Sequence, residues 1–209
     1  NGHVAIVGTT ADEKAAKDEE GLLLIAPVVG YVVGTFADAG QGDEVTAPSL
    51  VCSETGPDVM VWRQQISQGK ADVWTASLDQ GHLVGPVIAV EQAFDPHLAV
   101  DGTGSHWIGY HAGGAFLTHG SGPGTLLAEL GKFVEVTAFG QTVAVLYAEW
   151  PTREALQLAT TPEGQAQRQA HLRVSLDGGA TWATREPSGA LGYGPCNVVV
   201  DADSVDGVC

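Results

Sequence analysis

The sequence predicts an all-β protein, a β-propeller of four-stranded antiparallel blades. Three observations predict it: one turn pattern recurs four times, the same order of strands precedes each copy, and the composition suits short strands and tight turns. The chain has 28 glycines and 10 prolines among its 209 residues, and glycine and proline mark turns between strands. This length suffices for one core and is short for two domains. We therefore expect a single propeller domain over 1–209.

The repeated turn is most complete at 175–182, which reads SLDGGATW. Weaker copies read TASLDQGHLV, FLTHGSGPGT and LIAPVVGYVV. Every copy keeps a glycine, at Gly30, Gly81, Gly122 and Gly179. Self-similarity of this kind is typical of repeat architectures, in which each copy belongs to one structural unit.

The same elements come in the same order ahead of each turn. A first strand, often opened by proline where a sheet tolerates it, is followed by a glycine-bearing turn and a second strand. A third strand enters the repeated turn and a fourth leaves it. The expected first strands are 48–51, 96–99, 133–139 and 197–200, the second 58–63, 106–111 and 142–147, the third 71–77 and 171–175, and the fourth 83–90 and 181–184.

The ends of the chain predict closure of the ring. The strand at 197–200 would complete a blade with strands at 3–9, 22–26 and 31–36, which removes an exposed sheet edge. The four blades would then span approximately 46–90, 91–131, 132–189, and 190–209 combined with 1–45. A β-sandwich and half of a larger ring completed by a second chain are the alternatives.

The segment SLDGGATW resembles the Asp-box, or BNR repeat, of the sialidase-like propellers. The resemblance implies a structural turn on the outer part of a blade. An aspartate before a tight turn accepts hydrogen bonds from backbone N–H groups, glycine adopts positive φ at little cost, and tryptophan packs on neighbouring strands. The residues that would do this are Ser175, Asp177, Gly179, Thr181 and Trp182.

The catalytic set of the sialidases has no visible source in this chain. Those enzymes hold a carboxylate with three arginines, including one near the amino end. The five arginines here are Arg63, Arg153, Arg168, Arg173 and Arg185, so none lies early in the chain. Sialidase activity is therefore not expected. A glycoside hydrolase that needs only paired carboxylates stays an alternative, with Asp95, Asp101 and Glu149 as candidate acids on inner strands.

The expected function is non-enzymatic recognition of a glycan or an extracellular protein on one face of the propeller. Binding faces of propellers are formed by the loops after the second and fourth strands, and long loops on a rigid scaffold are often functional. The longest such loop covers 149–170. The candidate ligand-binding residues are Arg63, His111, Glu149, Trp150, Arg153 and Tyr193, with packing inside a blade as the alternative role of Trp150.

One segment predicts a calcium site. Asp201, Asp203 and Asp206 lie in a turn followed by glycine, and closely spaced carboxylates suit hard cations. The spacing departs from the EF-hand loop, and a plain polar turn is the alternative. No other cofactor is expected, and His106, His111 and His119 lack the spacing of a zinc site.

The net charge and the cysteines restrict the partners and the cellular location that we expect. The net charge of −16 supplies no basic footprint for nucleic acid, and no apolar run is long enough to insert into a membrane. Cys196 and Cys209 flank a predicted hairpin that would place them opposite each other for a disulfide. A secreted or cell-surface protein that has lost a leader, or a piece of a longer chain, is therefore expected. Cys52 is left over. A third alternative is therefore a structural module or fragment whose open ends pair with another chain, as in a homo-oligomer, and in which Cys52 forms an intermolecular bridge.

Overall fold

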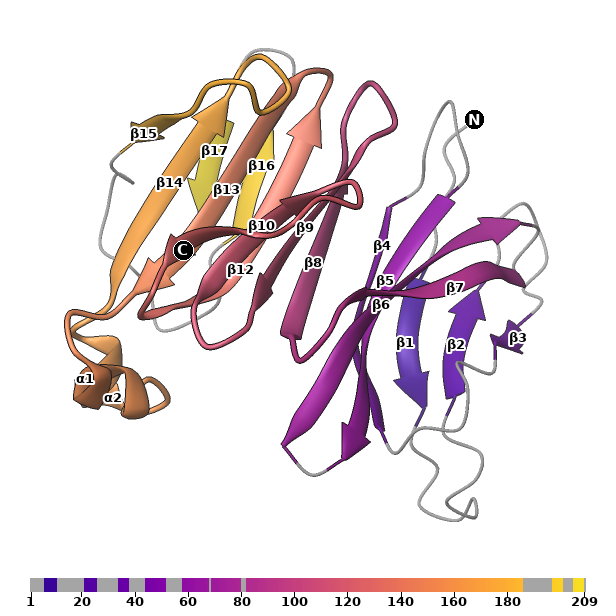
Figure 1. The fold of residues 1–209 in the computed structure, drawn as a ribbon, viewed down its shortest axis with the longest axis horizontal. Helices are drawn as coiled ribbons and strands as arrows, with labels where there is room; N and C mark the ends of the chain where they lie inside the picture. The colour runs from indigo at the N-terminus through magenta and orange to yellow at the C-terminus, as the bar shows by residue number, and fades with distance from the viewer. Residues whose placement is uncertain are drawn as a thin grey trace. The chain divides into compact units, whose positions relative to one another are not determined.

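The computed structural model describes residues 6–10, 21–25, 34–37, 44–51, 58–67, 69–79, 82–185, 197–200 and 205–208. The chain forms two compact units, Asn1–Pro96 and His97–Cys209. Both are built of antiparallel sheets (Figure 1). Among the described residues the helices are two short ones, and neither is long and apolar enough to cross a membrane.

The amino-terminal unit contains a three-stranded and a four-stranded sheet, each with its strands in chain order. β1 packs against β4 and β3 against β7, so the two sheets are neighbours within this unit. The strands are β1 (Ile6–Thr10), β2 (Gly21–Ile25), β3 (Gly34–Ala37), β4 (Glu44–Val51), β5 (Asp58–Ser67), β6 (Lys70–Asp79) and β7 (His82–Val90).

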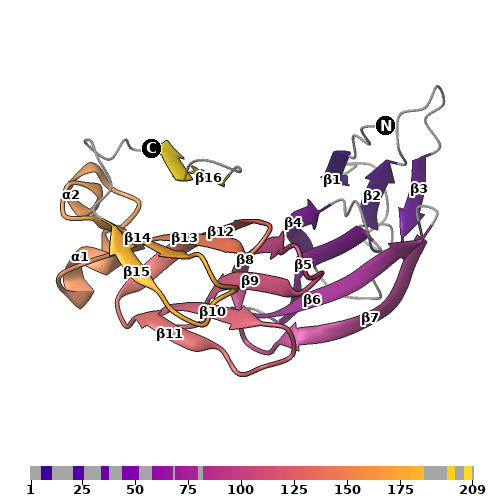
Figure 2. The same ribbon diagram turned by 90° about the horizontal axis from the view of Figure 1, so that it is seen from above.

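The carboxy-terminal unit contains two four-stranded sheets and a hairpin. The first sheet has β8 (Phe94–Val100), β9 (His106–His111), β10 (Ala115–His119) and β11 (Thr125–Ala128). The second has β12 (Gly131–Phe139), β13 (Thr142–Glu149), β14 (Gln169–Ser175) and β15 (Ala183–Arg185), and the hairpin has β16 (Asn197–Val200) and β17 (Val205–Val208). Seen from above, these form successive layers, with β16 against β12 and β13 (Figure 2).

The main core of the carboxy-terminal unit lies between its two four-stranded sheets. Alternate residues of β13 face this core because successive side chains of a strand point to opposite faces. Val143, Val145 and Tyr147 contact Trp107 and Leu117 of the other sheet in one buried cluster. Burial of large apolar side chains contributes roughly 1.5–3 kcal/mol each, so this layer fixes the two sheets on each other.

The all-β prediction and the four-stranded antiparallel unit are confirmed, with three such sheets in chain order among the described residues. Several expected strands begin and end within two residues of the observed ones, and β9 matches at both ends. β16 pairs with β17 through the predicted hairpin, with Asn197 opposite Val208. The number of blades and the closure of the ring stay predictions.

The segment after β13 differs from the expected irregular loop. It contains α1 (Arg153–Gln157) and α2 (Pro162–Gln165). Thr152 and Thr161 are the N-cap residues, and their hydroxyls accept hydrogen bonds from the backbone N–H groups of Ala155 and Gly164. Such caps satisfy amides that have no partner inside a helix. The two helices lie at the opposite end of β14 from the β14–β15 turn (Figure 1).

Candidate functional site

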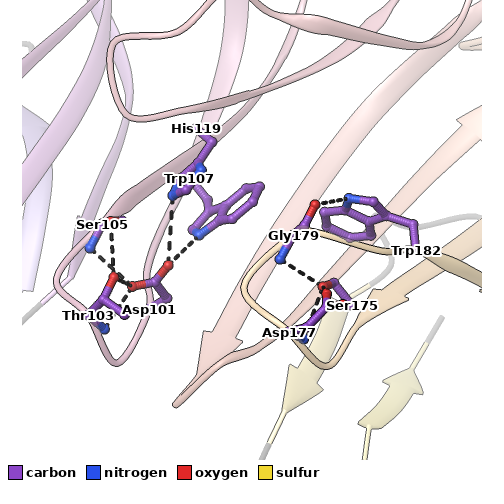
Figure 3. Close-up of polar contacts among 9 residues, drawn as sticks. All are labelled: Asp101, Thr103, Ser105, Trp107, His119, Ser175, Asp177, Gly179 and Trp182. Atoms are coloured by element: carbon purple, nitrogen blue, oxygen red, sulfur yellow. Dashed lines mark hydrogen bonds and ion pairs between the residues drawn. The ribbon is translucent and has the colours of Figure 1, made fainter.

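The turn at 175–182, between β14 and β15, is organised by the carboxylate of Asp177. One oxygen, Oδ1, accepts hydrogen bonds from the Ser175 hydroxyl at 2.7 Å and the Thr181 backbone N–H at 2.8 Å. The other, Oδ2, accepts from the Thr181 hydroxyl at 2.7 Å. The Ser175 hydroxyl oxygen in turn accepts from the Gly179 N–H at 2.8 Å (Figure 3). The side chains of Ser175, Asp177 and Thr181 therefore stabilise the turn.

These hydrogen bonds also set the ionisation of the carboxylate. Those from Thr181, first from its hydroxyl and then from its N–H, and that from Ser175 lower the pKa of Asp177 from 3.8 to about 2. Hydrogen bonds to the charged form favour that form. Asp177 is therefore ionised over the physiological pH range and has no proton to donate as an acid.

A second carboxylate-centred turn joins β8 to β9. Asp101 Oδ1 accepts hydrogen bonds from the Thr103 N–H at 2.9 Å, the Thr103 hydroxyl at 2.6 Å and the Ser105 N–H at 3.1 Å. Asp101 Oδ2 accepts from the indole Nε1 of Trp107 at 2.9 Å (Figure 3). Asp101 thereby fixes both the turn and the first aromatic ring of the following strand.

Asp101 does not suit the acid role that the hydrolase alternative gives it. Its side chain is buried. Burial alone would raise the pKa of Asp101, but the hydrogen bonds from Thr103, Trp107 and Ser105 outweigh burial and hold the pKa below 3.8. A general acid in glycoside hydrolysis needs a raised pKa. Asp101 is therefore a structural carboxylate, which corrects its assignment as a candidate catalytic acid.

The two turns meet at Trp107, whose indole has a neighbour on three sides. The His119 ring stacks on it with centroids 3.9 Å apart and planes 7° from parallel. Trp182 meets it edge-on, with centroids 5.8 Å apart and planes at 75°. Gly179, at φ +88°, lies directly against its six-membered ring. The Trp182 indole N–H donates to the Gly179 carbonyl at 3.1 Å, so each tryptophan is fixed by one of the turns (Figure 3).

A cleft of about 210 Å³ opens beside this aromatic group, between the two four-stranded sheets of the carboxy-terminal unit. His119 and Trp182 contribute partly exposed rings, since the His119 side chain is 44% exposed and Trp182 is half-buried. The full lining is Trp107, Leu117, His119, Pro123, Thr125, Leu127, Val145, Arg173, Gly179 and Trp182. An apolar floor with a few polar groups is the usual form of a small-molecule site.

The face predicted for ligand binding lies at the opposite end of these strands. Glu149 is the last residue of β13, and its Oε2 lies 3.1 Å from His171 Nε2. The His171 ring stacks on Tyr147 with centroids 5.1 Å apart. This ion pair leaves the Glu149 carboxylate partly exposed. Arg153 is exposed on α1 close by in the chain.

Trp150 is buried beneath the two helices. It is 1% exposed, and its indole N–H donates to the Gly164 carbonyl at 2.8 Å. Its neighbours are Ala148, Ala155 and Ala159. In this structure Trp150 stabilises the loop and presents no surface to a ligand. The observed role is therefore packing, the alternative to the ligand-binding role that the sequence suggested.

The remaining predicted residues lie on several different elements. Arg63 lies within β5, which extends to Ser67, so it is on a strand and not on the expected loop; its guanidinium lies 5.0 Å from the centre of the Phe94 ring. His111 ends β9 ahead of a tight turn. Asp95 is exposed with φ +49°. Tyr193 and Cys52 lie outside the described residues.

The calcium and disulfide predictions also lie mostly outside the described part of the chain. Asp201, Asp203, Cys196 and Cys209 are not described, and Asp206 is described only as a residue of β17. Within the described residues no group of three histidine, cysteine or carboxylate side chains is placed to hold a metal ion.

Sequence reasoning singled out two residues of the cleft lining, but only as structural residues of a turn, and it did not predict the cleft. Trp182 and Gly179 belong to the complete copy of the repeated turn, whereas His119 lies in an eroded copy and Trp107 on β9. The segment DGTGSHW at 101–107 carried a signal, since an aspartate followed by Thr and Ser at alternate positions suits a hydrogen-bonded turn. Nothing in the sequence indicated that this turn meets the one at 175–182.

Comparison with known proteins leaves the family open. No protein-family model matches the chain, and no curated protein matches it. A solved structure of xylan β-1,4-xylosidase from Bacillus halodurans is similar, with a TM-score of 0.49 and 16% identity. The similarity covers 90% of this chain and 40% of the xylosidase, so the chain spans less than half the length of that protein. The resemblance of the turn to the Asp-box therefore rests on the motif alone.

Proposed function

We propose that this protein is a non-enzymatic carbohydrate-recognition module that holds one sugar ring in the cleft between His119 and Trp182. The observation that carries the proposal is the convergence of two carboxylate-fixed turns on one aromatic cleft. Aromatic side chains offer a flat apolar surface of fixed geometry, which suits the C–H face of a sugar. The rings are held before a ligand arrives, so binding costs little further ordering.

The size of the cleft supports a single ring as the bound unit. At about 210 Å³ it is smaller than the roughly 300–1,000 Å³ of sites for drug-sized ligands. A terminal or branching sugar of a longer glycan, or a side chain of a protein partner, is of suitable size. Thr125, His119 and Arg173 are the lining residues able to bond hydroxyl groups.

The hydrolase alternative finds less support around this cleft. Hydrolysis of a glycosidic bond generally uses two carboxyl groups placed on either side of it, and the lining contains neither an aspartate nor a glutamate. Asp101 and Asp177 are nearby, but both are held in the ionised form by their turns. Glu149 is paired with His171 at the other end of the strands.

The test is binding to a glycan array, followed by titration of the strongest ligand against single variants. Removal of the ring in Trp182→Ala is expected to weaken binding at least tenfold, a loss of about 1.4 kcal/mol. The matched control is Leu176→Ala, because Leu176 lies in the same turn, is 70% exposed and does not line the cleft. Equal affinity of Trp182→Ala and wild type, or no binding to any glycan at high protein concentration, would refute the proposal.

A secreted setting, a homo-oligomer and calcium binding by Asp201, Asp203 and Asp206 remain parts of the proposal. Calcium that binds only the folded state must raise the melting temperature. We expect a higher melting temperature with Ca²⁺ than with chelator, and loss of that difference in Asp203→Asn. The same melting temperature in both conditions would remove the calcium site. Native mass measurement with and without reductant tests the oligomer.

A further inference from the structure

The cleft differs from the rest of the molecule in its charge. The chain contains 25 acidic and 9 basic residues, yet the ionisable residues that line the cleft are one arginine and one histidine, with no carboxylate. In so acidic a protein, a lining with only basic ionisable groups is a distinct local feature. An arginine in a small, partly apolar cleft favours an anionic ligand, because low polarity strengthens charge interactions.

Arg173, on β14, is held in place from one side. Its guanidinium carbon lies 5.9 Å from the centre of the Tyr147 ring, and it donates a hydrogen bond to the Tyr147 hydroxyl. Burial raises the pKa of Tyr147, an effect that Arg173 only partly offsets, so the phenol stays neutral. A guanidinium has five N–H donors in a fixed plane, and one bond to a phenol leaves others to form charge-assisted bonds to a carboxylate.

His119 supplies a ring and a polar edge to the cleft. Its ring lies on the Trp107 indole, and its Nε2 is 3.9 Å from Asp101 Oδ2. An imidazole ring can form hydrogen bonds with the polar groups of a ligand.

We infer that the cleft binds a sugar ring that carries a carboxylate, the hexuronate unit of an acidic glycan, with Arg173 as its charged contact. This inference rests on the proposed function and adds the chemical class of the ligand. The aromatic rings contact the apolar face of the sugar, and Arg173 holds its carboxylate. A neutral sugar would make the first set of contacts without the second.

The experiment compares digalacturonate with neutral galactobiose by calorimetric titration. We expect a preference for digalacturonate of about tenfold or more. Arg173→Gln should weaken digalacturonate binding more than galactobiose binding and so remove most of the preference.

His171→Gln is the matched control, because this histidine lies on the same strand as Arg173 but outside the cleft lining. It should keep the preference for digalacturonate. Equal wild-type affinity for the two disaccharides would overturn the inference and leave the proposed function standing. Failure of both disaccharides and of every glycan on the array would instead overturn the proposed function. The wild-type comparison decides the inference even where a variant fails to fold.

Discussion

Gly179 and Trp107 are in direct contact although Gly179 lies in the β14–β15 turn and Trp107 lies on β9 of the other sheet. A Cβ atom placed on Gly179 would overlap the end of the Trp107 six-membered ring. The backbone of Gly179 is at φ +88°, a conformation that glycine adopts readily and other residues rarely. Two constraints therefore favour glycine at position 179: the positive φ of the turn and the close approach of the Trp107 indole.

Gly179→Ala should therefore destabilise the protein more than the same change at its neighbour. Gly178 is also at positive φ, +64°, but nothing lies within 4 Å of a Cβ built there. We expect Gly178→Ala to cost about 1–2 kcal/mol for its backbone alone. Gly179→Ala should cost a further 1–3 kcal/mol or so for overpacking. Denaturant unfolding of both variants measures the difference, and equal costs would show that Trp107 is not held against the turn.

The stability supplied by the Asp177 turn should depend on pH in the acid range. Hydrogen bonds from Thr181 and Ser175 lower the pKa of Asp177 from 3.8 to about 2. A group with a lowered folded pKa contributes stability above its unfolded pKa, and this is lost as the pH falls through the folded value. The difference in melting temperature between wild type and Asp177→Asn should be largest above about pH 4 and should decrease toward pH 2. A constant difference across that range would contradict the hydrogen-bond arrangement.

Trp150 should matter for the loop after β13 and not for the cleft. Trp150→Ala removes a fully buried ring and leaves the Gly164 carbonyl without its indole donor, so we expect a loss of about 3–5 kcal/mol. Trypsin should then cut faster at Arg153, which is exposed on α1. Leu158→Ala, in the same loop but 45% exposed, is the control. It should change neither the rate of trypsin cleavage nor the stability of the protein much. Loss of glycan binding in a folded Trp150→Phe protein would contradict this division.

The sequence was a good guide to strands and a poor guide to the site, and the two outcomes have different causes. A strand such as β9 is specified locally, by an apolar run between a glycine-bearing turn and a tight turn, and His106–His111 was predicted to the residue. The cleft depends on how two sheets pack, which brings together His119, at the end of β10, and Trp182, in the β14–β15 turn. That packing has no local signal.

The eroded copies of the turn show a similar limit. In FLTHGSGPGT the glycine shared with the other copies is Gly122, but the glycine with positive φ is Gly120, at +60°. Thr118 instead bonds Gly122, its hydroxyl donating to the Gly122 carbonyl at 2.6 Å. The two short helices were missed although Thr152 and Thr161 are N-cap residues and Pro162 opens α2. Threonine followed by proline is a helix-start signal, but the whole segment was interpreted as one long loop.

Asp101→Asn should release the Trp107 indole and weaken ligand binding in the cleft. An amide keeps the shape of the carboxylate but has a single acceptor oxygen, and Asp101 accepts three hydrogen bonds at Oδ1 and one, from Trp107, at Oδ2. The oxygen will face the larger set, so the NH₂ group opposes the indole N–H. We expect a loss of about 1.5–3 kcal/mol, the range for hydrogen bonds to charged groups.

The matched control is Asp72→Asn. Asp72 is equally buried and accepts a hydrogen bond from the Gln92 N–H at 2.9 Å, a bond that an amide oxygen can keep, so its loss of stability should be smaller. The measurements are denaturant unfolding and glycan titration of both variants. If Asp101→Asn binds the ligand as tightly as wild type does, Trp107 needs no fixed position for recognition, and the cleft is not preorganised by the β8–β9 turn.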